Sequence, residues 1–281
     1  LADVGAAQGL KSRWKKMKKM LHIYAFEPNK EAASLLKKKY NNKYNYDIFP
    51  EAVWSSEGLN EFNLTKGPNE SSLLKPNGER VNNFANDDRF EIVDKFTVKT
   101  TTIDKTINGE LDSLKIDIQG GSFEVLLGAF NKLEEVITLE LEFEFYDIYK
   151  NQKTFFDILS FLNECNFVFE DFTELHRWNR GKTDFSGGRV VFGDALFIKD
   201  FNFIDFKDDK KLQKFLALIL LYRRYDLFDK VLDNLDNTTK NKYKKFLKSV
   251  MILSSKSKKN QYFSGIMARL NGTGASSYTI F

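Results

Sequence analysis

Short strand-like segments alternate with helical segments through the first two hundred residues, and this alternation restricts the fold more than any other feature. Strands that alternate with helices of about a dozen residues are typical of a doubly wound, mostly parallel α/β sheet with its ligand crevice at the strand carboxyl ends. The expected strands cover residues 1–4, 22–26, 46–49, 114–118, 136–145, 167–171 and 195–198, and the expected helices cover 10–20, 30–39, 123–130 and 154–164. A less regular segment with strands around Val53 and Phe62 and an extended run over 96–102 interrupts this order.

The net charge of +4 conceals a change of sign along the chain. Residues 205–281 hold 16 basic and 7 acidic residues and carry +9, whereas residues 1–204 carry −5. The second part is helical, with amphipathic patterns over 212–219, 227–235 and 243–251. We therefore expect a ligand-binding domain over 1–202, a helical extension over 203–254 and a loosely ordered tail over 255–281.

Cysteine content and hydropathy indicate the compartment. The single cysteine, Cys165, excludes an internal disulfide and fits a reducing environment. The longest apolar run, residues 215–222, is far shorter than the ~20 residues that span a membrane. We expect a soluble, cytoplasmic protein without a transmembrane segment. Because the chain starts without Met and inside a strand, we expect residues upstream of Leu1.

The first turn, "DVGAAQG", indicates the kind of ligand. It lacks the G-x-G-x-x-G pattern of dinucleotide sites and the Lys-Ser/Thr pair of phosphate loops. Asp3 ahead of the turn would repel a phosphate and suits a cation such as S-adenosylmethionine, which carries an ammonium and a sulfonium. Glu27 ends the second strand, at the distance where an acidic residue meets ribose hydroxyls in doubly wound folds.

Several motifs together resemble the FkbM family of S-adenosylmethionine-dependent methyltransferases. They run in order from "DVGAAQG" through "FEPNKEAASLL", "AVWSSEG", "SSLL" and "TTTID" to "LKIDIQGGSFEVLLGA", "ELEFEFYDIYKNQ" and "GDALFI". This resemblance covers roughly the first 200 residues and implies a Rossmann-like class I methyltransferase fold. Two departures from the family pattern are Ala7, where Asn is usual, and Ser122, where Glu is usual.

The resemblance implies roles for individual residues. Asp3, Gly5 and Gly9 would line the methionine end of the cofactor, Glu27 would hold the ribose, and Glu51 with Ala52 would lie beside the adenine. Asp117 would face the sulfonium and the acceptor, and Glu142 matches the carboxylate of the fifth strand. The serines of "SSLL", Ser71 and Ser72, would border the acceptor pocket.

Candidates for the chemistry are Asp117, Glu142 and His176. Glu140, Glu142 and Glu144 alternate, so they share one face of a strand. For Glu144 we favour a place past the strand end or at an exposed edge. His176 lies in a segment that we interpret as a polar loop. It could act as a general base, or its side chain could simply be solvated. Ser122 is expected to cap the following helix.

Metal chemistry is weakly indicated. One Cys and two well-separated His residues exclude a zinc-type cluster, although an oxygen-lined Mg²⁺ or Ca²⁺ site from Asp117, Gln119 and Glu142 stays open. We assign no residue as a metal ligand.

Two functions follow. The favoured one is O-methylation of a sugar, a glycan or another small hydroxylated acceptor by S-adenosylmethionine. The alternative is a non-catalytic methyltransferase fold, in which Ser122 marks lost chemistry and the basic helices dock an anionic partner. We expect no nucleic-acid partner, and a nicotinamide dehydrogenase is disfavoured by the missing glycine.

Overall fold

The structure, a computed structural model, describes residues 1–15, 17, 20–40, 45–181 and 187–255. It divides into a unit over residues 1–221 and a unit that begins at Tyr222. Residues 256–281 of the tail expected over 255–281 and residues 16, 18 and 19 of the expected first helix lie outside the described residues.

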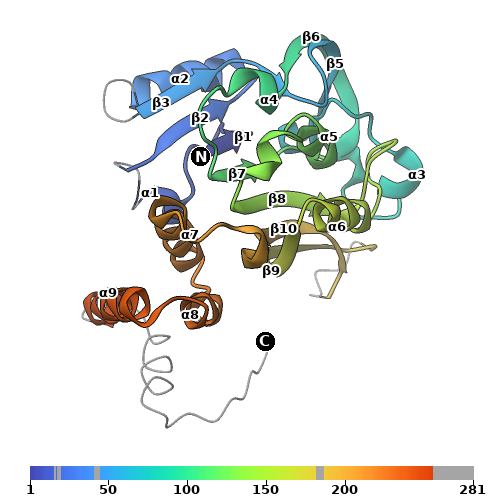
Figure 1. The fold of residues 1–281 in the computed structure, drawn as a ribbon. Helices are drawn as coiled ribbons and strands as arrows, with labels where there is room; N and C mark the ends of the chain where they lie inside the picture. Colours follow the sequence, from blue (N-terminus) through green and yellow to red (C-terminus); the bar gives the residue numbers. More distant parts are fainter. Residues whose placement is uncertain (16, 18–19, 41–44, 182–186, 256–281) are drawn as a thin grey trace. The chain divides into compact units, whose positions relative to one another are not determined.

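The first unit contains a seven-stranded sheet in the order β3-β2-β1-β7-β8-β10-β9 (Figure 1). Its strands are β1 (Ala2–Val4), β2 (His22–Phe26), β3 (Asn45–Phe49), β7 (Ser113–Ile116), β8 (Thr138–Glu144), β9 (Phe167–Trp178) and β10 (Arg189–Lys199). β1, β2, β3, β7 and β8 pair in parallel, and β10 is antiparallel to both of its neighbours. The expected doubly wound, mostly parallel fold is therefore confirmed. The order reverses between β1 and β7, which is where such sheets bind ligands.

Helices cover both faces of this sheet. α4 (Ile103–Thr106), α5 (Ser122–Leu127) and α6 (Phe155–Glu164) supply Ile103, Val125 and Phe155 to the large core. α2 (Lys30–Tyr40) packs Leu36 and Tyr40 against Ala25 on the other face, and a short α1 (Ser12–Lys15) follows the first turn. Because side chains alternate along β2, Phe26 and Ala25 point into these two different cores.

The irregular segment between β3 and β7 forms a second, three-stranded sheet and is called the insert below. β4 (Ala52–Val53), β6 (Ile92–Thr101) and β5 (Gly58–Thr65) make the sheet. Between β5 and β6 the chain forms η1 (Pro68–Glu70), α3 (Gly78–Val81) and η2 (Asp87–Phe90). Phe84 and Phe90 pack edge-on or tilted against Trp178 of β9, with ring centroids 5.3 and 5.6 Å apart. This insert is thereby fixed beside the ends of β8, β9 and β10.

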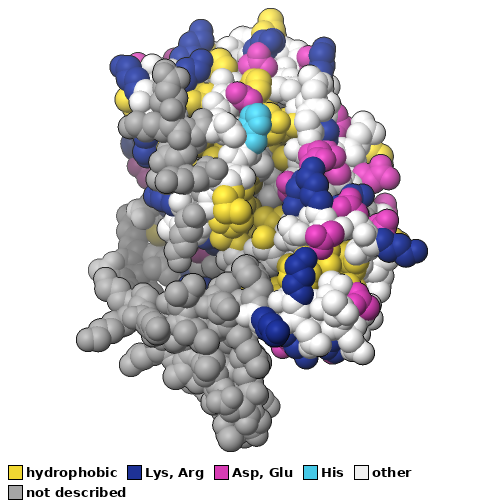
Figure 2. All heavy atoms as spheres, turned by 60° about the vertical axis from the view of Figure 1, so that its left-hand side comes forward, with side chains coloured by type: hydrophobic (Ala, Val, Ile, Leu, Met, Phe, Trp, Pro, Cys, Tyr) yellow, Lys and Arg dark blue, Asp and Glu magenta, His cyan; other side chains and the backbone are white. Residues whose placement is uncertain are grey.

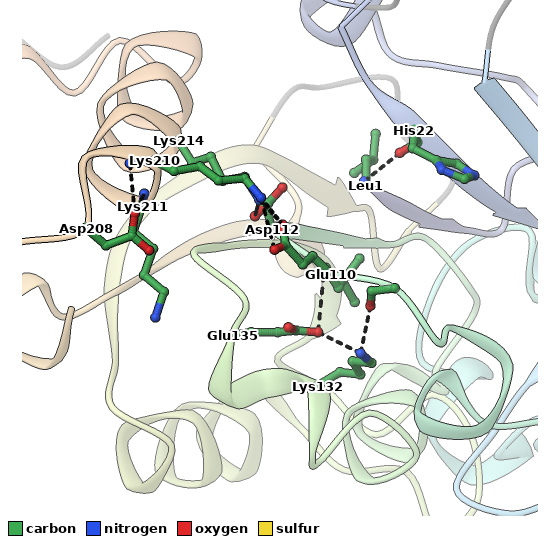
Figure 3. A network of polar contacts seen from close by, with 12 residues as sticks. Leu1, His22, Glu110, Asp112, Lys132, Glu135, Asp208, Lys210, Lys211 and Lys214 are labelled. Atoms are coloured by element: carbon green, nitrogen blue, oxygen red, sulfur yellow. Dashed lines mark hydrogen bonds and ion pairs between the residues drawn. The ribbon is translucent and has the colours of Figure 1, made fainter. Parts of the chain in front are cut away.

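α7 (Asp209–Leu221) follows η4 (Phe201–Phe203) and belongs to the unit of the sheet. Lys214 reaches Glu110 and Asp112 ahead of β7 at 2.6 and 2.7 Å, and Lys210 also points at Glu110 (Figure 3). The division between the units therefore falls after Leu221, whereas the charge pattern predicted a boundary near residue 202.

The second unit contains α8 (Tyr225–Asp233) and α9 (Asn237–Ser255), which pack on each other. Phe228, Val231 and Leu232 are buried, and Lys240 pairs with Asp233 at 2.6 Å. In the part of the chain that the structure describes, no helix is both long and apolar enough to cross a membrane.

Candidate active site

A cavity of about 530 Å³ opens at the carboxyl ends of β1, β2, β7 and β8, at the point where the strand order reverses. This volume lies within the usual range of small-molecule sites. Nine of the eleven residues that the sequence proposed for the site line this cavity: Gly5, Glu27, Glu51, Ala52, Ser71, Ser72, Asp117, Glu142 and His176. Asp3 and Gly9 are not part of this lining.

The first turn forms the cavity floor through its backbone. Gly5 has φ +80, and a Cβ there would lie 2.0 Å from the carbonyl oxygen of Asp117, so only glycine lets these two strand ends come together. Gly9, with φ +72, approaches the Tyr40 hydroxyl instead. Gly9 therefore shapes the turn against α2 and does not line the cavity.

Glu27 follows β2 directly and is 6% exposed. Its carboxylate accepts a hydrogen bond from the Asn29 N–H at 2.8 Å, and burial raises its pKa. Glu51 lies farther along the wall and pairs with Lys99 at 2.5 Å. Two carboxylates at this end fit hydroxyl and amino groups of a ligand better than phosphates.

A buried lysine was missed by the sequence analysis. Lys115 of β7 lies 3.0 Å from Asp3 Oδ1 and 3.1 Å from Asp117 Oδ2, and its side chain is 5% exposed. Burial alone would lower the pKa of Lys115, and the two carboxylates raise it instead. Asp3 is fully buried, and its Oδ2 has no hydrogen-bond partner among the described residues. The available signal was a lysine inside the buried strand motif "LKID".

The three glutamates of β8 share the face opposite the large core. Glu140 pairs with Lys11 at 3.1 Å and Arg13 at 3.4 Å. Glu142 accepts two bonds from Gln119 Nε2, at 2.8 and 3.1 Å. Glu144 accepts a bond from the Gly120 N–H at 3.0 Å and is 2% exposed. The expected edge or exposed position of Glu144 is therefore wrong, because β8 is central and the 119–120 loop folds over it.

Burial has a strong electrostatic effect on two of these glutamates. It raises the pKa of Glu142 well above its usual value, and the negative charges of Glu144, Asp117 and Asp194 add to this rise. Burial also raises the pKa of Glu144 to about 8, although the Gly120 N–H opposes the rise. The cavity therefore borders on carboxyls with a raised affinity for protons.

Glu144→Gln should change the pH dependence of stability. Because the folded pKa is above the unfolded value, Glu144 favours the folded state fully below about pH 4.5, and that contribution is lost as pH rises towards 8. The free energy of unfolding of the wild type should fall with pH in this window, with a slope of up to about 1.4 kcal/mol per unit for this group. Denaturant unfolding should show a smaller slope for Glu144→Gln, while the exposed control Glu164→Gln keeps the wild-type slope. Equal slopes in all three proteins would refute the assignment.

Two expected loop or cap positions differ from the structure. His176 lies within β9, not in a loop, where it stacks on Phe192 at 4.3 Å and pairs with Glu174 at 3.2 Å. β9 is longer than its hydrophobic segment predicted because its end pairs with β10 through polar residues. The N-cap of α5 is Gly121, and the Ser122 hydroxyl donates to the Glu142 carbonyl oxygen at 2.6 Å. Ser122 thus ties α5 to β8.

The serines of the insert hold the wall of the cavity. The Ser72 hydroxyl donates to the Gln119 carbonyl oxygen at 2.6 Å, and the Ser71 hydroxyl accepts from the Thr65 N–H at 3.1 Å. Gln119 in turn positions Glu142. Among the described residues, no three His, Cys, Asp or Glu side chains are arranged to hold a metal ion.

A second hollow, of about 520 Å³, lies at the opposite ends of β7 and β8. Figure 3 shows that charged groups there pair with one another, as Lys132 does with Glu135 at 2.7 Å. We assign the active site to the first cavity, because sheets of this kind bind ligands at their carboxyl ends.

Comparison with known proteins places the chain in a family. Residues 3–169 match the methyltransferase FkbM domain. The chain belongs to the FkbM methyltransferase family. A solved FkbM methyltransferase from Methylobacillus flagellatus KT is 12% identical, with a TM-score of 0.37 over 70% of this chain, and the matched region spans 42% of that protein. No curated protein matches the chain.

The FkbM match ends within β9, so it includes the first turn, Glu27, Lys115 and Glu142. β10, the end of β9 with His176, and the helices after residue 200 lie beyond it. Part of the cavity lining, from His176, Trp178 and Phe192, thus lies outside the matched domain.

Proposed function

We propose that this FkbM-family protein transfers a methyl group from S-adenosylmethionine to a hydroxyl of a sugar, a glycan or a similar small acceptor. The observation that carries the proposal is one cavity that joins Gly5, Glu27 and Glu51 on the β1–β2 side to Glu142 on the β8 side. The family supports methyl transfer as the reaction, and the cavity supports the choice of donor.

The residues present fit S-adenosylmethionine. Gly5 lines the cavity, and its lack of a Cβ lets the ends of β1 and β7 meet there. Glu27 would accept hydrogen bonds from the ribose hydroxyls, Glu51 and Ala52 would lie beside the adenine, and Asp117 would face the positive end. When bound, the sulfonium supplies an activated methyl group.

Glu142 is the base that we assign to the reaction. The acceptor oxygen forms a bond to the methyl carbon as the carbon–sulfur bond breaks, and the sulfur keeps the electron pair. The hydroxyl proton must leave, and the Glu142 carboxylate lines the cavity where it can accept this proton. Gln119 holds this carboxylate in place, whereas the Asp117 carboxylate is engaged with Lys115.

Glu27→Ala should weaken binding of S-adenosylhomocysteine at least tenfold. Each hydrogen bond to a charged group contributes about 1.5–3 kcal/mol, and about 1.4 kcal/mol corresponds to tenfold in affinity. Calorimetric titration measures the change, and the exposed Glu31→Ala in α2 serves as the control. Equal affinities of wild type and Glu27→Ala for S-adenosylhomocysteine would contradict the assignment of the S-adenosylmethionine site to this cavity.

The alternative is a non-catalytic module that docks an anionic partner through the basic helices. On the face drawn in Figure 2, Lys and Arg side chains lie among Asp and Glu side chains. Binding of S-adenosylhomocysteine without any methyl transfer would favour this alternative.

A further inference from the structure

The charge of the cavity restricts the acceptor. Five carboxylates line it, from Glu27, Glu51, Glu70, Asp117 and Glu142. Among the described residues of the lining, no side chain is Lys or Arg. Because like charges repel, this lining disfavours an anionic ligand.

The acceptor side is built by the insert and by the ends of β9 and β10. Trp178, Phe192 and Phe62 line this side, and the ring centroids of Trp178 and Phe192 lie 5.7 Å apart. Their rings supply apolar surface that carries no charge.

One guanidinium lies directly against this side. Arg89 of η2 stacks over Trp178 at 4.2 Å and does not itself line the cavity. Its Nε is 3.3 Å from Glu70 Oε1, and the two side chains are 26% and 19% exposed. Without Glu70, a planar guanidinium in this place would be suited to bind a phosphate or carboxylate.

The backbone holds Glu70 where it pairs with Arg89. The Tyr149 hydroxyl donates to the Glu70 carbonyl oxygen at 2.9 Å. The Glu70 side chain folds back over Gly67, where a Cβ would lie 2.4 Å from Glu70 Oε2. Tyr149 thus holds the Glu70 backbone, and the Glu70 carboxylate, which lines the cavity, contacts Gly67 and Arg89.

We propose that Glu70 determines acceptor specificity by neutralising Arg89, so that the site takes uncharged hydroxyl compounds and rejects sugar phosphates and sugar nucleotides. This inference rests on the proposed function and narrows its acceptor class. Rejection of a wrong ligand by an uncompensated like charge is a common route to specificity.

The test compares wild type, Glu70→Gln and the control Glu61→Gln. Gln keeps the size of Glu70 but frees the charge of Arg89, whereas Glu61 is exposed and pairs with Lys95 away from the cavity. The first readout is calorimetric binding of glucose 6-phosphate to each protein loaded with S-adenosylhomocysteine. We expect Glu70→Gln to bind it at least tenfold more tightly than wild type and Glu61→Gln.

The second readout is labelled methyl transfer to matched panels of uncharged glycosides and their phosphorylated or nucleotide-linked forms. Wild type should label the uncharged panel alone, and Glu70→Gln should gain label in the phosphorylated panel. Equal binding of glucose 6-phosphate by wild type and Glu70→Gln overturns the proposal, as does wild-type labelling of the phosphorylated panel or of neither panel. Failure of wild type to bind S-adenosylhomocysteine would count against the proposed function instead, and the comparison on unloaded protein would still decide the role of Glu70.

Discussion

Glu142→Gln should lower the rate of methyl transfer by about 10² to 10⁴, the usual cost of losing a general base. The amide keeps the size of the side chain and still faces Gln119, but it takes no proton at neutral pH. Because Glu142 is assigned to proton removal, affinity for S-adenosylhomocysteine should stay within a few fold of wild type.

Single-turnover transfer with a labelled donor measures this effect. His176→Gln is the matched comparison, because His176 lines the same cavity but stacks on Phe192 and pairs with Glu174. We expect less than a tenfold loss for His176→Gln. A large loss of rate in His176→Gln, with a wild-type rate in Glu142→Gln, would identify His176 as the base instead. An intact rate in both variants would leave Asp117 as the proton acceptor.

Lys115→Met should lower the free energy of unfolding by about 3–5 kcal/mol. Removing one partner of a buried ion pair leaves its charge uncompensated, and here two carboxylates, Asp3 and Asp117, would lose the same cation. Burial already raises the pKa of Asp3, and without Lys115 this carboxyl would take up a proton at still higher pH. The loss of stability should therefore be largest at high pH.

Denaturant unfolding at two pH values provides the measurement, with Lys99→Met as the control. Lys99 pairs with Glu51, but its side chain is 65% exposed, so its loss should cost no more than about 1 kcal/mol. Adding Asp3→Asn to Lys115→Met should recover part of the stability. Equal losses for Lys99→Met and Lys115→Met would show that the buried pairs contribute little.

The positions of the strands along the chain could be predicted well where apolar residues alternated regularly. The strands around Leu114 and Leu139 send alternate apolar residues into the large core, so their periodicity was clear although charged residues occupy the other face. The end of β9 was missed because His176 and its neighbours are polar and half-exposed, and their strand conformation depends on pairing with β10. Pairing between distant segments leaves little local signal.

The candidate site was predictable in part for a similar reason. Motifs next to strand ends located Gly5, Glu27 and Asp117, since the carboxyl ends of parallel strands meet at one edge of a sheet. The roles of Lys115, Gln119 and Arg89 depend on contacts across neighbouring strands and the insert. Spacing along one chain does not reveal such contacts, and it led to the wrong positions for Ser122 and Glu144.

Transfer of a labelled methyl group from S-adenosylmethionine to oxygen tests the central claim most directly. Wild type and Glu142→Gln should be incubated with labelled donor and a pool of uncharged glycosides, and S-adenosylhomocysteine and alkali-stable labelled product should be counted together. We predict that wild type forms both in equal amounts, at least a hundredfold faster than Glu142→Gln. Wild-type formation no faster than that of Glu142→Gln, or label recovered on nitrogen, would contradict the account.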